Sequence, residues 1–397
     1  MSGLFDNQQQ GMQQIGMLRG SGLHGYALET SSGCGPTMMV QGKECVNFIS
    51  NSYLGFSTHP KVIESVKLAV AKYGMGIGGS PLACGTSDLH NKLCERLAAN
   101  YGKEDAILFA SGYQALLGTI QGLMRRGDVA LLDNLDHRSI IDGCALAGCK
   151  LRSFKHNDMA DLADLLERTS KAGPRRLLVV DSVYSMDGDV AKLDEIVPLC
   201  RQADVAVMID EAHSLGVMGK TGKGVLEHFE MDPSTVGFVS GTFSKFAGAV
   251  GGFTAADREF IDFLRHFSSP LVFSASLPPL VVAAVLASFD LLEQEPEWLE
   301  RLWKNVAFMF DGLNNLGLDT ADSTTPCIPI MVGDTEKVLR MNLDLLKEGV
   351  YCSPVVHPGV PLRKERLRLG VMASHSQAHL EKALDGIAKV AKKHELI

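Results

Sequence analysis

Continuous apolar segments that alternate with helical patterns determine the fold class of this chain. Two of them, residues 177–181 and 205–210, are apolar up to a final acidic residue, Asp181 or Asp210. A strand that is apolar throughout is buried on both faces, as in a mostly parallel sheet covered by helices. Other strands and helices of this region are expected at 106–110, 113–124, 129–133 and 138–147. The alternation therefore predicts an α/β fold.

A lysine follows a further strand of the same kind. Residues 235–240 indicate a short buried strand, and the sequence GTFSK then carries Lys245 into an expected tight turn. Ligands of parallel sheets bind beyond the carboxyl ends of the strands. Asp181, Asp210 and Lys245 should therefore share one site. Taken alone, a lysine in such a turn is most often only solvated, and an acid there can cap the next helix.

Changes in amino-acid composition and in the expected pattern of helices and strands suggest three regions. Residues 1–46 are rich in Gly, Gln and Ser and are expected to form an N-terminal arm, packed on another subunit or on the mouth of the site, or a partly disordered tail. Residues 47–295 form the large domain, and residues 296–397 a smaller α/β domain. The remaining elements are expected as a strand and turn at 47–60, helices at 61–73, 89–101, 278–295, 297–316, 335–348 and 377–393, strands at 328–331 and 366–370, and a glycine-dense loop at 74–85.

Charge and cysteine content exclude several classes of function. A net charge of −8 disfavours nucleic acid or an anionic membrane as the main partner. Nine scattered cysteines without zinc spacing predict reduced thiols, no metal site and a cytoplasmic location. The start of the chain lacks the pattern of a signal peptide. The longest apolar stretch, 278–289, is too short for a transmembrane segment.

Four stretches together resemble the α-oxoamine synthase family of fold-type I pyridoxal-phosphate enzymes. The resemblance extends from about Asn47 to about His375. It implies an aspartate-aminotransferase-like fold, a homodimer with shared active sites, and the condensation of an amino acid with an acyl thioester, with release of CO2. The stretches are FASGY at 109–113, VVDSVYSMDG at 179–188, VMIDEAH at 207–213 and GTFSK at 241–245.

The resemblance implies catalytic roles for four residues. Lys245 would form the Schiff base with pyridoxal phosphate and later remove the α-proton of the amino acid. Asp210 would hold the protonated pyridine nitrogen, so that the ring accepts electrons. His213 would lie near the ring hydroxyl and polarise the thioester carbonyl. His137 would stack over the ring.

Further residues match family positions that bind the cofactor. Main-chain N–H groups at the start of a helix bind phosphate well, and residues 111–113 lie at such a start. By the same resemblance, Thr242 would donate a hydroxyl hydrogen bond to the phosphate and Ser185 would bind the ring hydroxyl. Ser274 would reach the phosphate bound by the neighbouring subunit. The residues are Ser111, Gly112, Tyr113, Thr242, Ser185 and Ser274.

The motifs define the amino-acid substrate less closely than they define the cofactor. Asn51 and Arg368 match residues that bind the carboxylate of the amino acid, although Arg368 is also compatible with a surface strand residue. GTFSK and FSASLPP are most similar to serine palmitoyltransferases. The segment 354–358 lacks an arginine and is more similar to enzymes that use glycine or alanine, such as 2-amino-3-ketobutyrate CoA ligase, 8-amino-7-oxononanoate synthase and autoinducer synthases.

Several alternatives stay open. The amino acid, the acyl chain length, and coenzyme A or a carrier protein as the thiol are not determined. An aminotransferase or a lyase of the same fold is a runner-up. A catalytically silent partner subunit is disfavoured, because such subunits lack the lysine that this chain has at Lys245.

Overall fold

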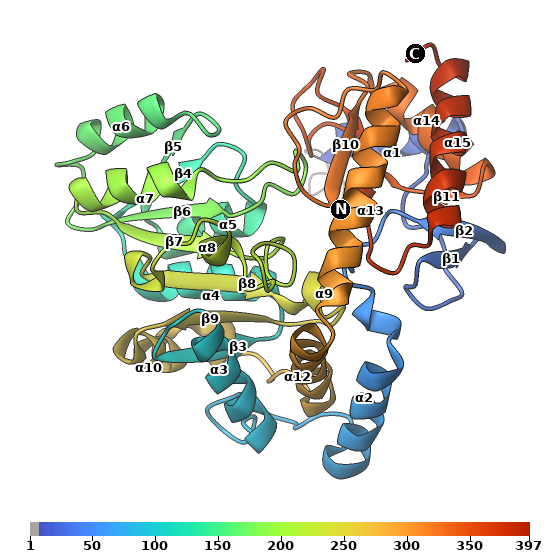
Figure 1. Cartoon of the computed structure of the whole chain (residues 1–397). Helices are drawn as coiled ribbons and strands as arrows, with labels where there is room; N and C mark the ends of the chain where they lie inside the picture. The colour runs from blue at the N-terminus through green and yellow to red at the C-terminus, as the bar shows by residue number, and fades with distance from the viewer. Residues whose placement is uncertain (1–7) are drawn as a thin grey trace. The chain divides into compact units, whose positions relative to one another are not determined.

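The structure, a computed structural model, describes residues 8–397 and divides into two compact units (Figure 1). One unit is Asn51–Leu302, and the other combines the described residues up to Ser50 with Trp303–Ile397. The predicted boundaries lie at 46/47 and 295/296, with residues 1–46 expected as an arm. Residues 1–7 of that predicted arm lie outside the described residues.

The larger unit is built on a seven-stranded sheet with the order β3-β9-β8-β7-β6-β4-β5. Strand β9 is antiparallel to its two neighbours, and every other neighbouring pair is parallel. This confirms the predicted α/β fold with a mostly parallel sheet. The strands are β3 (Asp105–Phe109), β4 (Val129–Asp133), β5 (Lys150–Phe154), β6 (Arg176–Asp181), β7 (Ala206–Asp210), β8 (Phe238–Thr242) and β9 (Gly252–Ala256).

Helices connect and cover these strands (Figure 1). Helix α4 packs on β8 and β9 and against α5, whereas α12 packs on α2 and α3. The helices are α2 (Pro60–Tyr73), α3 (Asp88–Asn100), α4 (Gly112–Leu123), α5 (Arg138–Ala147), α6 (Met159–Arg168), α7 (Leu193–Gln202), α8 (Val225–His228), α9 (Phe243–Phe246), α10 (Arg258–Phe267), α11 (Ser269–Val272) and α12 (Pro279–Gln294), with 3-10 turns at Phe56–Thr58 and Pro233–Thr235.

The main core lies between α4 and the sheet. Leu116 and Ile120 of α4 pack with Leu132, Val179 and Met208 of the strands, and all of them are buried. Burying one such side chain stabilises the fold by about 1.5–3 kcal/mol. The core therefore fixes the start of α4 at the carboxyl edge of the sheet.

The segment around Lys245 differs from its prediction. The preceding strand is Phe238–Thr242 rather than 235–240, and Lys245 lies on the short helix α9 rather than in a tight turn. Thr242 caps this helix, because its Oγ1 accepts the N–H of Ser244 at 3.3 Å. The small residues Gly241 and Thr242 continue the strand because they pair in register with Phe253 and Gly252 of β9.

The smaller unit contains two three-stranded sheets, ordered β1-β2-β11 and β10-β13-β12. Strand β2 pairs with β1 and, in parallel, with β11, so the N-terminal segment completes a sheet whose other strand comes late in the chain. The elements are α1 (Gln9–Gly20), β1 (Thr37–Val40), β2 (Lys43–Asn47), α13 (Glu297–Asn315), β10 (Cys327–Met331), α14 (Thr335–Lys347), β11 (Val350–Tyr351), β12 (Ser353–Val355), β13 (Arg366–Gly370) and α15 (Gln377–Lys393). Helix α13 begins just before the division between the units.

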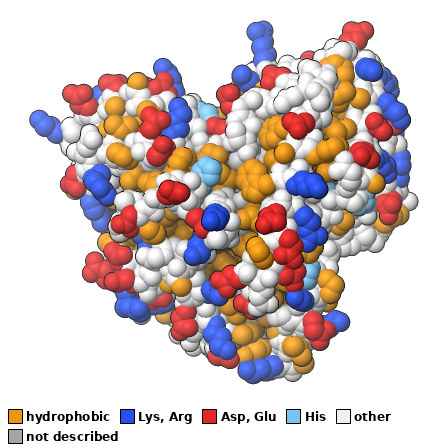
Figure 2. Space-filling model, viewed as in Figure 1, with side chains coloured by type: hydrophobic (Ala, Val, Ile, Leu, Met, Phe, Trp, Pro, Cys, Tyr) orange, Lys and Arg blue, Asp and Glu red, His pale blue; other side chains and the backbone are white. Residues whose placement is uncertain are grey.

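Acidic and basic side chains are interspersed on the face shown in Figure 2, rather than gathered by sign. Among residues 8–397, no helix combines the length and the apolar character needed to cross a membrane. Within the same residues, no group of three or more His, Cys, Asp or Glu side chains could hold a metal ion.

Candidate active site

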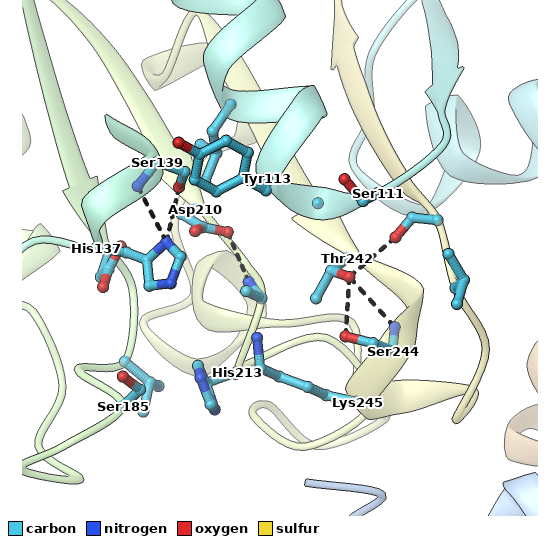
Figure 3. A pocket seen from close by; sticks show the side chains of 17 residues that line it. Ser111, Tyr113, His137, Ser139, Ser185, Asp210, His213, Thr242, Ser244 and Lys245 are labelled. Carbon is cyan, nitrogen blue, oxygen red and sulfur yellow. Dashed lines mark hydrogen bonds between the residues drawn. The ribbon is translucent and has the colours of Figure 1, made fainter. Parts of the chain in front are cut away.

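A cavity of about 280 Å³ lies in the larger unit, beyond the carboxyl ends of β6, β7 and β8 (Figure 3). Most residues predicted for the site line it, together with Asp181, Ser139 and Ser244. The predicted residues that line it are Ser111, Gly112, Tyr113, His137, Ser185, Asp210, His213, Thr242 and Lys245. The structure thus brings together residues that are far apart in the sequence.

Lys245 enters the cavity from α9. Its side chain is half-buried, and in Figure 3 its amine end points into the space bordered by Asp210 and Thr242. Helix α9 is anchored by Phe243 and Phe246, which are both fully buried. A lysine on so short and well-packed a helix is held in position to form a covalent bond to a ligand in the cavity.

Asp210 forms the floor of the cavity at the end of β7. Its side chain is only 4% exposed, and its Oδ1 accepts the N–H of Ala212 at 2.9 Å. Burial raises the pKa of the carboxyl group above its usual range, while the positive charges of Lys245 and His137 oppose that rise. Asp210 is therefore a buried acid that a cationic ligand nitrogen would stabilise in its ionised form.

His213 follows β7 and is oriented by a tyrosine. Its Nδ1 lies 2.7 Å from the hydroxyl of Tyr53, which is itself buried. The same hydroxyl lies 3.4 Å from Oδ1 of Asn51. Tyr53 was not predicted as a site residue, since it lies 160 residues from His213 and only the tertiary fold joins them. Asn51 does not line the cavity, but it is linked to His213 through Tyr53.

His137 caps α5 on another wall of the cavity. Its Nδ1 lies 2.7 Å from Oγ of Ser139 and accepts the N–H of Ser139 at 3.3 Å. Partial burial lowers the pKa of His137; Asp210 opposes this effect and Lys245 adds to it. A flat imidazole with a fixed ring plane is suited to stacking against an aromatic ligand.

The start of α4 and the end of β8 form an anion cradle. Ser111 caps α4 by accepting the N–H of Gln114 at 3.2 Å, and the first N–H groups of this helix have no partner within the helix. Thr242 Oγ1 donates to the carbonyl of Gly251 at 2.9 Å. A Cβ at Gly112 would lie 2.5 Å from Cβ of Thr242, so only glycine allows this approach. The cradle fits a phosphate group.

Tyr113 and Ser185 occupy the edges of the cavity. The Tyr113 side chain is exposed and its hydroxyl donates to Asp142, so its contribution to the cradle is its main chain. Ser185 lies on the segment 183–190, which is closed by a bridge between Val183 and Val190. The carbonyl of Tyr184 accepts the N–H of Gly188 at 2.7 Å within the same segment.

A histidine clamp supports this segment from behind. His156 Nδ1 lies 3.1 Å from Oδ1 of Asp133, and its Nε2 lies 2.8 Å from Oδ2 of Asp189. Burial works against a charge on His156, but the hydrogen bonds to the two carboxylates prevail and raise its pKa to about 10. His156 therefore stays protonated at neutral pH and ties β4 to the segment that carries Ser185.

Ser274 and Arg368 do not line this cavity of the larger unit. Ser274 follows α11, does not line the cavity, and has the 87% exposed Phe273 as its neighbour. Arg368 belongs to the smaller unit, where it lies on β13 and is 4% exposed. The alternative of a surface strand residue is wrong for Arg368, because neighbouring strands bury it. Its Nη2 lies 3.0 Å from Sγ of Cys327.

Comparisons with known proteins agree with this arrangement. The sequence profile described as aminotransferase class I and II matches residues 43–387. The 8-amino-7-oxononanoate synthase of Symbiobacterium thermophilum is 39% identical over 386 residues, covering 97% of this chain and 98% of that protein. The serine palmitoyltransferase of Sphingobacterium spiritivorum is 39% identical over 379 residues, covering 96% of this chain and 94% of that protein. The solved serine palmitoyltransferase of Sphingomonas wittichii superposes with a TM-score of 0.94 at 32% identity, covering 99% of both chains.

Proposed function

This chain belongs to the α-oxoamine synthase family within the class I and II aminotransferases, and from that premise we propose which residues perform its chemistry and on which substrates. The reaction is a pyridoxal-phosphate-dependent decarboxylative condensation of an amino acid with an acyl thioester. The observation that carries the assignment of roles is the convergence of Lys245, Asp210, His137 and the anion cradle on one cavity.

The residues around the cavity fit pyridoxal phosphate. When bound, the cofactor supplies an electron-withdrawing ring that stabilises negative charge at the α-carbon of the amino acid. The cradle formed by Ser111, Gly112 and Thr242 would hold its phosphate, and Asp210 would hold its ring nitrogen in the protonated form. His137 would restrain one face of its ring.

Three side chains would handle protons and developing charge. Lys245, with its amine neutral, would remove the proton from the α-carbon and return one at the end of the cycle. Asp210 would keep its negative charge throughout and thereby stabilise the cationic ring. His213, held by Tyr53 at 2.7 Å, would donate a hydrogen bond to the thioester carbonyl as negative charge develops on that oxygen.

For the substrates, we favour serine and a long-chain acyl thioester. The similarity to solved serine palmitoyltransferases over 99% of the chain supports this choice. A second candidate is an enzyme that uses alanine or glycine, which the equal identity to an 8-amino-7-oxononanoate synthase supports. In either case Arg368 and Asn51 would bind the carboxylate of the amino acid.

A substrate panel tests these candidates. The purified protein is incubated with serine, alanine, glycine and 2-aminobutyrate, each against acyl-CoA and acyl carrier protein thioesters of several chain lengths, and the ketones are identified by mass. We expect a ketone from serine with a long-chain thioester. A product only from alanine or glycine would establish the second candidate, and transamination without release of free thiol would refute both.

We also propose that the protein is a cytoplasmic homodimer with shared active sites. Exposed apolar side chains in the larger unit support an interface, namely Phe273 at 87%, Val250 at 65% and Phe267 at 61%. The nine cysteines are all free thiols, as expected in a reducing compartment. Mixing inactive Lys245→Ala with an inactive Ser274→Trp variant should restore part of the activity. A fully active monomer in sedimentation experiments would refute the shared site.

A further inference from the structure

A second buried carboxyl group, that of Asp181, lies beside Asp210. Asp181 ends β6 and Asp210 ends β7, and the two residues are direct partners across these parallel strands. Neighbouring strands are about 4.8 Å apart, and both residues line the same cavity. Their side chains are 5% and 4% exposed. The two carboxyl groups are therefore neighbours on one side of the sheet, shielded from water.

One oxygen of Asp181 lacks a partner. Its Oδ1 is buried and makes no hydrogen bond to any of the described residues. The main-chain N–H of His137 favours the ionised form of this carboxyl group and so lowers its pKa. The N–H of Asp181 donates to Oδ1 of Asp136 at 2.9 Å, which fixes the backbone at this point. An oxygen held at the cavity wall without a protein partner is available for a hydrogen bond to a ligand.

The charges around the pair place one proton on Asp181. Two buried carboxylates this close cannot both ionise at low cost. Burial raises the pKa of both groups. Asp210 and Asp133 raise the pKa of Asp181 further, and Lys245 lowers it, but the pKa still lies well above its usual range. For Asp210, Lys245 and His137 both oppose the rise, and none of the other groups acting on it adds to the effect of burial. Asp136, on the loop after β4, also acts on the pair, as its own raised pKa reflects burial first and Asp181 second.

We propose that Asp181 is the proton-bearing member of an acid pair with Asp210, that its proton leaves the negative charge of the pair on Asp210, and that its unpaired oxygen forms a hydrogen bond with the bound cofactor. The proposal rests on the proposed function only for the identity of the ligand as pyridoxal phosphate. It explains why an acid can follow a second strand at this point without repelling Asp210. A neutral acid at this position keeps a donor and an acceptor in the cavity at no cost in charge.

Two substitutions of Asp181 distinguish its hydrogen bond to the cofactor from the charge of its carboxyl group. Asp181→Asn keeps the size and the hydrogen-bonding capacity of the side chain but cannot ionise. Asp181→Leu keeps a similar size and removes both properties. Asp128→Asn is the matched control, because Asp128 is an equally buried acid at the opposite end of β4, paired with Arg175 at 2.7 Å.

The affinity for pyridoxal phosphate, measured by fluorescence titration of the apo-protein, distinguishes the outcomes. We expect Asp181→Asn and Asp128→Asn to bind like the wild type, and Asp181→Leu to bind about threefold to tenfold more weakly, as for the loss of one hydrogen bond. An unchanged affinity in Asp181→Leu would overturn the contact. An affinity of Asp181→Asn as weak as that of Asp181→Leu would overturn the protonated state.

Infrared difference spectra between the wild type and Asp181→Asn provide a second test that does not require the leucine variant to fold. The loss of a protonated carboxyl C=O band supports the proposal, and the loss of a carboxylate band refutes it. Both measurements are independent of turnover. A failed substrate panel with these results intact would count against the proposed function and not against the acid pair.

Discussion

Replacing Gly252 with alanine should weaken cofactor binding although Gly252 itself is not among the residues assigned to bind the cofactor. Gly252 begins β9, beside the anion cradle. A Cβ at this position would lie 2.6 Å from Cα of Gly112, 2.7 Å from its N and 2.7 Å from the carbonyl oxygen of Ser111, whereas ordinary van der Waals contact begins at 3.4 Å. All three atoms belong to the main chain, so no side-chain rotation relieves the clash. The start of α4 must move away from β9.

The expected magnitudes follow from this displacement. Overpacking of a dense core costs about 1–3 kcal/mol of folding free energy. The N–H groups at the start of α4 move with the backbone, and the loss of one hydrogen bond to a charged group costs about 1.5–3 kcal/mol. The dissociation constant of pyridoxal phosphate should therefore rise roughly tenfold to a hundredfold.

The assay compares pyridoxal phosphate with pyridoxal, which lacks the phosphate. Gly122→Ala, in helix α4, is the matched control. The one short contact of its Cβ would be with Cδ2 of Leu264, at 2.4 Å, which is the end of a side chain and not main chain. We expect the Gly252→Ala variant to lose affinity for pyridoxal phosphate and to keep its affinity for pyridoxal. Equal losses for the two ligands, or none for either, would contradict the assignment of the cradle to the phosphate.

Four further substitutions test separate parts of the site. Lys245→Ala should abolish ketone formation and the visible absorbance of the bound cofactor while circular dichroism stays unchanged; near-normal turnover would exclude its covalent role. Asp210→Asn should retain the cofactor and lower kcat roughly a thousandfold, which corresponds to ~4 kcal/mol; an unchanged kcat would leave Asp210 with a structural role only. Arg368→Lys should raise KM for the amino acid about tenfold to a hundredfold, from ~1.5–3 kcal/mol, with little change for the thioester, because lysine lacks the paired donors; equal changes in both would refute carboxylate binding. His156→Gln should lower the free energy of unfolding most below pH 6.5 and progressively less as the pH rises through about 10, since the raised pKa of His156 stabilises the fold only while it is protonated; a pH-independent loss in urea titrations would contradict the charged clamp.

The parallel strands could be predicted because burial on both faces leaves an unbroken apolar run, as in β4 and β6. Strand β5 was missed because it lies at the edge of the sheet, where Lys150 and Arg152 face outward. Strand β9 was missed because its small residues, from Gly252 to Ala256, have no strong strand pattern. In both cases the segment forms a strand because of its neighbours in the sheet, and not because of a strand pattern in its own sequence.

Site residues could be predicted where they lie at the carboxyl ends of parallel strands. Asp210 and Lys245 follow from the rule that ligands bind at the carboxyl edge of a parallel sheet. Asp181 follows from the same rule, and it lines the cavity with them. Tyr53 and Gly252 act through proximity to residues on other elements, and no local pattern records such proximity. The pairing of β2 with β11 is likewise not indicated by the sequence of either segment alone.

That pairing has a consequence for how the chain is made. During synthesis both strands of the β1–β2 hairpin are available early, but β11, the partner of the other edge of β2, follows only roughly 300 residues later. At ~5–20 residues per second this delay is roughly 15–60 s. An open strand edge invites pairing with other chains. The nascent protein therefore carries an unpaired edge of β2 for most of its time on the ribosome. A message truncated before Val350 would release chains in which this edge never pairs with β11.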